Sequence, residues 1–144
     1  MSGGAVRSGR FDELSTATLY GLLQLRSEVF VVEQACAYGD LDGRDREPTT
    51  RHLWIEDDGA VVAYLRLLDD AGVLRIGRVA TAATHRNQGL AARLVTAALA
   101  STGGPVVLHA QSYLTAWYET FGFRITGPEF DDDGIPHVPM RLDR

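Results

Sequence analysis

Apolar side chains recur at helical spacing in three parts of this 144-residue chain. The first series predicts a helix over residues 16–31, and Ser15 can cap its start. A second helix begins after Gly89 and ends before Gly103. A third, shorter helix fits residues 112–121, where a glycine follows as a stop signal.

Strand-forming segments occupy much of the remaining chain. They lie around Arg10–Phe11 and at 52–56, 61–68, 73–81, 105–110, 123–129 and 135–142. Short turns separate the three central segments and predict an antiparallel meander. Because a helix separates 73–81 from 105–110, these two strands can pair in parallel as a crossover unit. We therefore expect an α+β fold whose sheet is antiparallel at both ends and parallel in the middle.

Two stretches show neither the helical nor the strand pattern of apolar residues. Residues 1–9 are small and polar, which predicts a flexible N-terminus before a single domain over residues 10–144. Residues 34–51 are rich in Gly, Asp, Arg and Pro and predict a loop of a length that is often functional. Its acidic side chains can attract a cationic ligand, but we interpret them as a solvated surface.

Composition and charge exclude several classes of protein. The net charge of −5 gives no sign of a nucleic-acid or anionic-membrane partner. Cys36 is the single cysteine, so no internal disulfide forms. No apolar run approaches the roughly 20 residues of a membrane span, and the start of the chain does not resemble a signal peptide. We expect a cytoplasmic protein with no membrane partner.

The segment 79–91 runs from the end of a strand into the start of a helix. A helix N-terminus offers free backbone N–H groups and a partial positive charge, which favours a phosphate group. Gly89 has no Cβ and lets a ligand approach the backbone, and Arg86 adds a cation. The chain contains neither a Walker motif nor Gly-x-Gly-x-x-Gly, so nucleotide and dinucleotide sites lack support.

Two motifs in this order resemble the GNAT superfamily of acyl-CoA N-acyltransferases. The family pattern Arg/Gln-x-x-Gly-x-Gly/Ala matches Arg86–Ala91, and its Tyr-Glu-x-x-Gly-Phe pattern matches Tyr118–Phe123. A narrower resemblance to the ElaA-type branch involves residues 25–34, Cys36, Tyr38, Asp40, Asp42, residues 133–137 and Met140. The resemblance implies a mixed, mostly antiparallel sheet with a central splayed parallel pair and helices on both faces.

The resemblance also implies a binding site for acetyl-CoA. The pantetheine arm would lie along the backbone of Val79, Ala80 and Thr81. The pyrophosphate would lie on the backbone of Arg86, Asn87, Gln88, Gly89, Leu90 and Ala91. Gln111 stands where the family usually has asparagine, which keeps the amide but lengthens the side chain.

Tyr118 matches the family's frequent general acid, which would protonate the departing thiolate. The acceptor, a primary amine of a small molecule or peptide, must in turn lose a proton, since its pKa lies near 10. Glu33 is our first candidate for the base, and His52, His109 and His137 are alternatives. A backbone N–H at or near Val79 would stabilise the oxyanion. The implied reaction is direct acetyl transfer with both substrates bound.

Other readings of the sequence stay open. The histidines show no metal-ligand spacing, so we expect no metal, and Cys36 has no identifiable catalytic partner. A non-catalytic acyl-CoA sensor would keep Arg86–Ala91 without needing an acid or a base. An acyl-homoserine-lactone-synthase-like acyltransferase is a third reading, for which the chain is short. A homodimer is compatible with the sequence.

Overall fold

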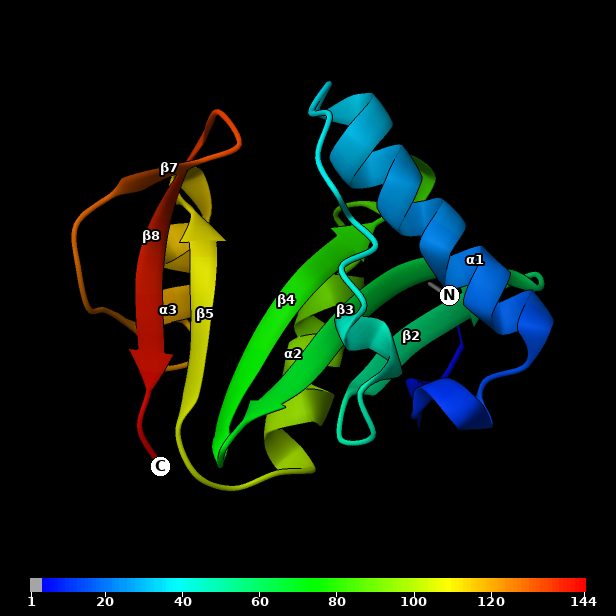
Figure 1. Cartoon of the computed structure of the whole chain (residues 1–144), viewed down its shortest axis with the longest axis horizontal. Helices are drawn as coiled ribbons and strands as arrows, with labels where there is room; N and C mark the ends of the chain where they lie inside the picture. Colours follow the sequence, from blue (N-terminus) through cyan, green and yellow to red (C-terminus); the bar gives the residue numbers. More distant parts are fainter. Residues whose placement is uncertain (1–3) are drawn as a thin grey trace.

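A twisted mixed β-sheet forms the centre of the computed structural model, which describes residues 4–144 (Figure 1). Its strands are β1 (Arg7–Gly9), β2 (Arg51–Asp57), β3 (Ala60–Asp70), β4 (Val73–Thr81), β5 (Val106–Gln111), β6 (Arg124–Ile125), β7 (Phe130–Asp132) and β8 (Ile135–Leu142). Their order is β1-β2-β3-β4-β5-β8-β6, with β7 also paired to β8. Only β4 and β5 pair in parallel, which confirms the mixed sheet predicted from the sequence.

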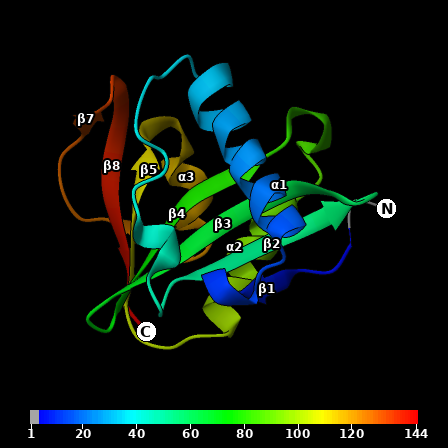
Figure 2. The same ribbon diagram turned by 45° about the vertical axis from the view of Figure 1, so that its right-hand side comes forward.

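Helices cover both faces of this sheet (Figure 2). Helix α1 (Thr16–Arg26) lies on one face and continues as a π-helix, Ser27–Glu33. Helices α2 (Leu90–Ala100) and α3 (Thr115–Glu119) lie on the other. The predicted N-cap of α1 is confirmed, because Ser15 Oγ accepts a hydrogen bond from Thr18 N at 3.0 Å. Short 3₁₀ helices occupy Phe11–Glu13, Arg44–Arg46, Ala83–His85 and Ser112–Leu114.

Two apolar cores follow from this arrangement. The larger packs α2 and α3 against the sheet around Leu65, Leu94 and Leu108. The smaller packs α1 against the other face around Leu22, Trp54 and Tyr64. Strands that carry a helix on each face are buried on both sides, which explains the nearly continuous apolar run of β3.

Several element boundaries differ from the sequence-based expectation. The first strand is Arg7–Gly9, within the stretch expected to be flexible, while residues 11–13 form a 3₁₀ turn; residues 1–3 lie outside the described chain. The strand expected over 123–129 is wrong: only Arg124–Ile125 pairs there. Pro128 lacks the N–H that a strand ladder needs, so pairing resumes only at β7.

Strands β4 and β5 splay apart after a short parallel contact. Only Leu74–Val106 and Arg75–Val107 are in register, and Figure 1 shows the strands diverging beyond them. A bulge interrupts β4 where its pairing with β3 shifts, and Arg78 there has a positive φ of 53°. The bulge bends β4 away from the straight course that would keep it beside β5.

An ion-pair network fastens the loop of residues 34–50 to the α1 face of the sheet. Its cations are Arg26 of α1, Arg66 of β3 and Arg78 of the bulge; its anions are Asp40, Asp42 and Asp45 of the loop. The fully buried Arg26 donates to Asp40 at 2.9 Å and to Asp45 at 2.7 Å. Arg66 donates to both Asp42 oxygens at 2.8 Å, and Arg78 Nε lies 2.9 Å from Asp40 Oδ1.

Two carboxylates of this network, those of Asp42 and Asp45, have pKa values shifted from the ordinary range. Desolvation acts to raise the pKa of Asp42 and Asp45, but hydrogen bonds and charges of the arginines outweigh it. The pKa of Asp42 is thereby lowered to about 2, and that of Asp45 is also lowered. Asp40 and Asp45 are buried, so our interpretation of this acidic loop as a solvated surface is wrong for these two residues.

Removing one member of the network should destabilise the protein strongly. Asp45→Asn leaves Arg26 buried without full charge compensation, and breaking a buried pair in this way costs about 3–5 kcal/mol. Denaturant unfolding measures the loss. The control is Arg7→Gln, which breaks a 3.7 Å pair with Glu56 at the surface and should cost about 1 kcal/mol or less. Equal losses in the two variants would contradict the central role of the network.

Candidate active site

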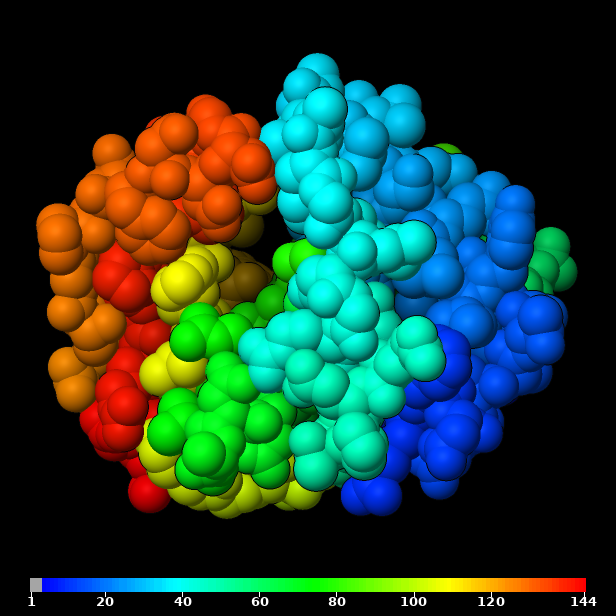
Figure 3. Space-filling model, in the orientation of Figure 1, coloured from blue at the N-terminus to red at the C-terminus, as the bar shows by residue number. Residues whose placement is uncertain are grey.

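A cavity of about 220 Å³ opens where β4 and β5 splay apart. Figure 3 shows the hollow at the centre of this face, bordered by the loop after the π-helix, by β4 and β5, and by the β7–β8 turn. Its lining includes Gln34, Cys36 and Tyr38 from the loop, Arg75, Arg78 and Val79 from β4, His109 and Gln111 from β5, Tyr118 from α3, and Asp132, Asp133 and His137 from the turn and β8. The cavity is therefore built from segments far apart in the sequence.

The segment assigned to the pyrophosphate lies at the start of α2. Asn87 and Gly89 have positive φ values of 63° and 75°, and left-handed residues of this kind occur in turns whose backbone N–H groups bind anions. Gly89 is the N-cap and provides no side-chain cap, so the first N–H groups of α2 are not satisfied by it. A Cβ added at Gly89 would meet no atom within 4 Å, which leaves open space above this backbone. The cradle fits an anionic group.

The other residues of this segment have distinct positions. Gln88 is exposed, whereas Leu90 turns inward with 2% of its surface exposed, and Ala91 lies in the first turn of α2. On β4, Ala80 is buried under α1, and the Thr81 carbonyl accepts a hydrogen bond from Arg86. Ala80, Leu90 and Ala91 have apolar side chains, so their only polar groups are those of the backbone.

Glu33 and Arg86 form a bidentate ion pair, with N–O distances of 2.5 and 2.6 Å. The hydrogen bond from Arg86 lowers the pKa of Glu33, and that of Arg86 is raised in return. Glu33 ends the π-helix but is not part of the cavity lining. The two residues that the sequence assigned to the base and to the phosphate loop are thus bound to each other.

Tyr118 lines the cavity from α3 while 94% of its surface is buried. Burial, with a smaller contribution from Tyr113, raises the pKa of its phenol well above the usual value. Its ring packs edge-on against Trp117 and Phe123, which fixes its direction. Within residues 4–144 its hydroxyl has no hydrogen-bond partner. A protonated phenol is therefore available inside the cavity.

The β4 bulge supplies a second polar group. Tyr64 lies opposite Ala80 and Arg66 opposite Gly77, so Arg78 and Val79 have no register partner on β3. Strand β5 has already diverged at this point. Val79 lines the cavity, and its backbone N–H lies in the unpaired stretch of the strand.

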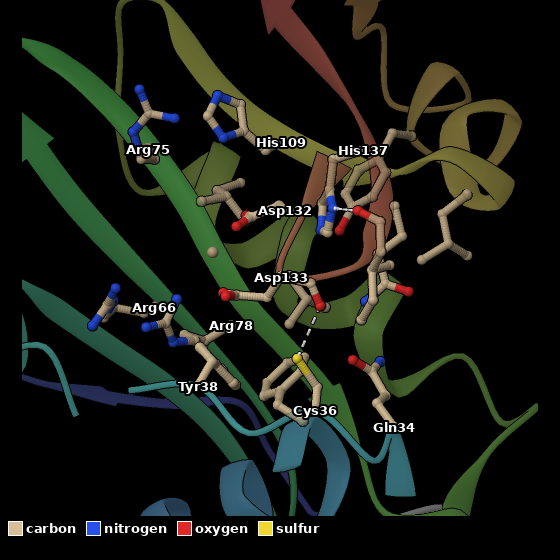
Figure 4. Close-up of a pocket in the computed structure, with 18 of the residues that line it drawn as sticks. Gln34, Cys36, Tyr38, Arg66, Arg75, Arg78, His109, Asp132, Asp133 and His137 are labelled. Atoms are coloured by element: carbon tan, nitrogen blue, oxygen red, sulfur yellow. Dashed lines mark hydrogen bonds between the residues drawn. The ribbon is translucent and has the colours of Figure 1, made fainter. Parts of the chain in front are cut away.

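The candidate histidines fall into two groups. His52 is fully buried and uses both ring nitrogens, with Nδ1 at 2.5 Å from Tyr64 Oη and Nε2 at 3.0 Å from the Asp45 carbonyl. His109 and His137 instead line the cavity (Figure 4). These histidines could not be separated from the sequence, because the distinction depends on which face of each strand meets the cavity.

Sequence reasoning missed the three cavity arginines, Arg66, Arg75 and Arg78. A charged residue in an otherwise apolar strand needs a partner, so their positions were the available signal. It also missed that Cys36 Sγ lies 3.3 Å from the Asp133 carbonyl, a contact that joins the loop to the β7–β8 turn across the cavity (Figure 4). Gln111 does line the cavity, at the end of β5.

The described residues contain neither a metal-binding cluster nor a membrane-spanning helix. In residues 4–144, no group of three or more His, Cys, Asp or Glu side chains is arranged to hold a metal ion. No helix in the same part of the chain is both long and apolar enough to cross a membrane.

Known proteins share both this sequence and this fold. A family model described as an acetyltransferase (GNAT) domain matches residues 15–144. A UPF0039 protein of Mycobacterium tuberculosis is 54% identical over 142 residues, which cover 94% of this chain and 91% of that protein. Protein ElaA of Escherichia coli is 41% identical over 139 residues, covering 90% of each chain.

Solved structures agree with these relatives. The crystal structure of E. coli ElaA covers 96% of this chain and 99% of its own, with a TM-score of 0.91 and 35% identity in that superposition. An acyl-CoA N-acyltransferase from Pseudomonas aeruginosa gives the same coverage and TM-score at 40% identity. The chain therefore belongs to the GNAT acetyltransferase family and is ElaA-like.

Proposed function

We propose that this protein is an N-acetyltransferase that moves the acetyl group of acetyl-CoA directly to a primary amine. One observation carries the proposal: the splay of β4 and β5 opens a cavity that reaches both an unpaired stretch of backbone and the protonated phenol of Tyr118. The uncapped start of α2 follows the same strand. These are the groups that thioester aminolysis requires: an anion cradle, an oxyanion donor and an acid.

The phosphate groups of the coenzyme would bind the N–H groups at the start of α2, with Arg86 beside them. The pantetheine arm would follow Val79, Ala80 and Thr81, and Gln111 would face it from β5. The N–H of Val79 would donate to the carbonyl oxygen as negative charge develops there.

Tyr118 would donate its proton to the departing sulfur, since its raised pKa keeps the phenol protonated at neutral pH. We propose that Glu33 positions Arg86 and does not take part in proton transfer. Its lowered pKa makes it a weak base, and its carboxylate is occupied by the guanidinium outside the cavity lining.

A methyl group at Gly89 should block the cradle. Gly89→Ala places a Cβ where the phosphate would lie, and losing one hydrogen bond to a charged group, worth about 1.5–3 kcal/mol, weakens CoA binding roughly tenfold or more. Calorimetry with CoA measures this. Gly59→Ala is the matched control, because Gly59 has a similar φ of 78° and equally open surroundings in the β2–β3 turn. Both variants should lose comparable stability, and only the first should lose affinity.

Removing the phenolic proton should impair turnover without affecting CoA binding. Tyr118→Phe should lower kcat about 10²- to 10⁴-fold, the usual contribution of a positioned acid. Thiol release from acetyl-CoA with a panel of amines measures kcat, and calorimetry measures CoA binding. Tyr113→Phe serves as the control, since Tyr113 is 77% exposed. The chain has no lysine, so acetylation of its own side-chain amines cannot contribute to the thiol signal.

Glu33→Gln tests the assignment of Glu33. The variant frees Arg86 and removes a negative charge beside the cradle, so CoA should bind about two- to fivefold tighter. This range corresponds to the loss of an exposed ion pair, which contributes less than about 1 kcal/mol. Glu28→Gln, one turn earlier, makes the same charge change without this contact. If Glu33→Gln instead abolishes turnover and leaves CoA affinity unchanged, Glu33 is the base after all.

The same assays separate the alternative functions. Tight CoA binding with no turnover of any amine would indicate an acyl-CoA sensor. Thiol release that requires S-adenosylmethionine as the acceptor would indicate an acyl-homoserine-lactone-synthase-like enzyme. Absence of CoA binding would overturn the proposed function.

A further inference from the structure

His137 stands on β8 between β5 and β7, where it is opposite Gln111 on one side and Phe130 on the other. Its side chain lines the cavity that holds Tyr118 and Val79. Figure 4 shows its ring, with its dashed hydrogen bond, among the labelled side chains that line the cavity. It lies within the segment 133–137, to which the proposed reaction has so far given no role.

The local backbone fixes the tautomer of His137. Its Nδ1 lies 2.8 Å from the Ile135 carbonyl oxygen. A carbonyl can only accept, so Nδ1 must carry the hydrogen and donate it. In the neutral ring the other nitrogen, Nε2, then keeps its lone pair. Such a ring presents a proton acceptor whose direction is set by a backbone hydrogen bond.

Packing holds this ring in place. Phe130 stacks on His137, with ring centroids 6.0 Å apart and an interplanar angle of 27°. The other neighbour of Phe130 is His109, which meets it edge-on at 4.9 Å. Because β7 supplies Phe130 and β5 supplies His109, three strands fix the position of the imidazole.

Charged and titratable groups from every element around the cavity face His137. From β4 it faces Arg75 and Arg78, and from the β7–β8 turn Asp132 and Asp133; Tyr38, Cys36, Tyr118, His109 and the paired Arg66 complete the titratable lining. In the described chain, no carboxylate oxygen lies within ion-pair distance of His137. Burial, and to a smaller extent the charge of Arg75, lowers the pKa of His109. The imidazole of His109 is therefore uncharged at neutral pH.

The other candidate bases are occupied or lie elsewhere. Both nitrogens of His52 are bonded within the core. Glu33 is held by Arg86 and is not in the cavity lining. His109 shares the cavity but has no hydrogen bond that orients a ring nitrogen within residues 4–144. Among these residues, only His137 combines cavity placement with a fixed acceptor.

We propose that His137 is a catalytic residue that takes the proton from the acceptor's ammonium group through Nε2. This inference rests on the proposed N-acetyltransferase function. The ammonium N–H bond breaks, its electron pair stays on nitrogen, and the proton forms the Nε2–H bond of an imidazolium. The free amine then forms the N–C bond while the C–S bond breaks.

The remaining protons balance with the roles already assigned. Tyr118 gives its proton to the departing sulfur, and the phenolate regains one from the nitrogen as it becomes an amide. The imidazolium of His137 returns its proton to water through the open mouth of the cavity. The net reaction releases one proton for each amide formed.

The closing experiment compares His137→Gln with His109→Gln over a range of pH. Each variant is assayed with the best alkylamine of the panel and with its O-alkylhydroxylamine analogue, whose nitrogen is already deprotonated at neutral pH. For the alkylamine, kcat/KM of His137→Gln should fall about 10²- to 10⁴-fold and lose the acidic limb of its pH profile. With the analogue the loss should stay within about tenfold. His109→Gln should keep the acidic limb.

Several results would overturn the inference. The inference fails if His137→Gln keeps the acidic limb, if it loses activity equally with both acceptors, or if His109→Gln loses the limb. Each of these results would leave the proposed N-acetyltransferase function intact. If none of the amines in the panel makes the wild type release thiol, the proposed function fails and this inference fails with it.

Two measurements keep the comparison valid if His137→Gln folds poorly. CoA calorimetry and thermal melting establish whether the variant retains the native fold. Nitrogen-15 NMR of histidine in the wild-type protein reports the tautomer without any assay of turnover. A protonated Nδ1 and an unprotonated Nε2 at neutral pH support the assignment, whereas the opposite tautomer contradicts it.

Discussion

The ion-pair network of three arginines and three aspartates is the constraint on which the site depends. It joins α1, β3 and the β4 bulge to a loop that has no regular hydrogen-bonded ladder of its own. Since Arg26 is fully buried, its charge is tolerable only while Asp40 and Asp45 stay beside it. The network thereby holds Tyr38 and the rest of the loop as one wall of the cavity.

The bulge in β4 links this wall to the proposed chemistry. Arg78, at its positive φ, contributes to the network, while the next residue, Val79, brings its unpaired backbone to the cavity. Beyond the end of the same strand, directly after the 3₁₀ helix Ala83–His85, Arg86 forms an ion pair with Glu33 at the end of the π-helix. The proposed coenzyme site at Arg86 and the loop that forms one wall of the cavity are therefore connected through one strand and one helix.

Hydrophobic periodicity was sufficient to predict α1, α2 and the meander of β2, β3 and β4. It failed at 123–129, where a proline interrupts pairing and the short strands on either side of it, β6 and β7, pair with different parts of β8. The start of α2 was identified because a glycine-containing turn after a strand is a local signal. The role of Glu33 was not accessible in this way, because its partner lies 53 positions away.

The sequence by itself determined the order of the elements, the fold family and the glycine-containing turn at the start of α2, all of which depend on neighbouring residues or on motifs of fixed spacing. Only the tertiary structure decided which charged groups neutralise one another and which histidine faces the cavity. Asp40, Asp42 and Asp45 lie in a stretch whose composition is typical of a solvated loop. The residues next to His52, His109 and His137 in the sequence do not distinguish the roles of these histidines. The burial of each side chain and the direction in which it points distinguish these residues in the folded protein. The ionisation and tautomer of a side chain depend on partners that only folding brings within hydrogen-bond distance.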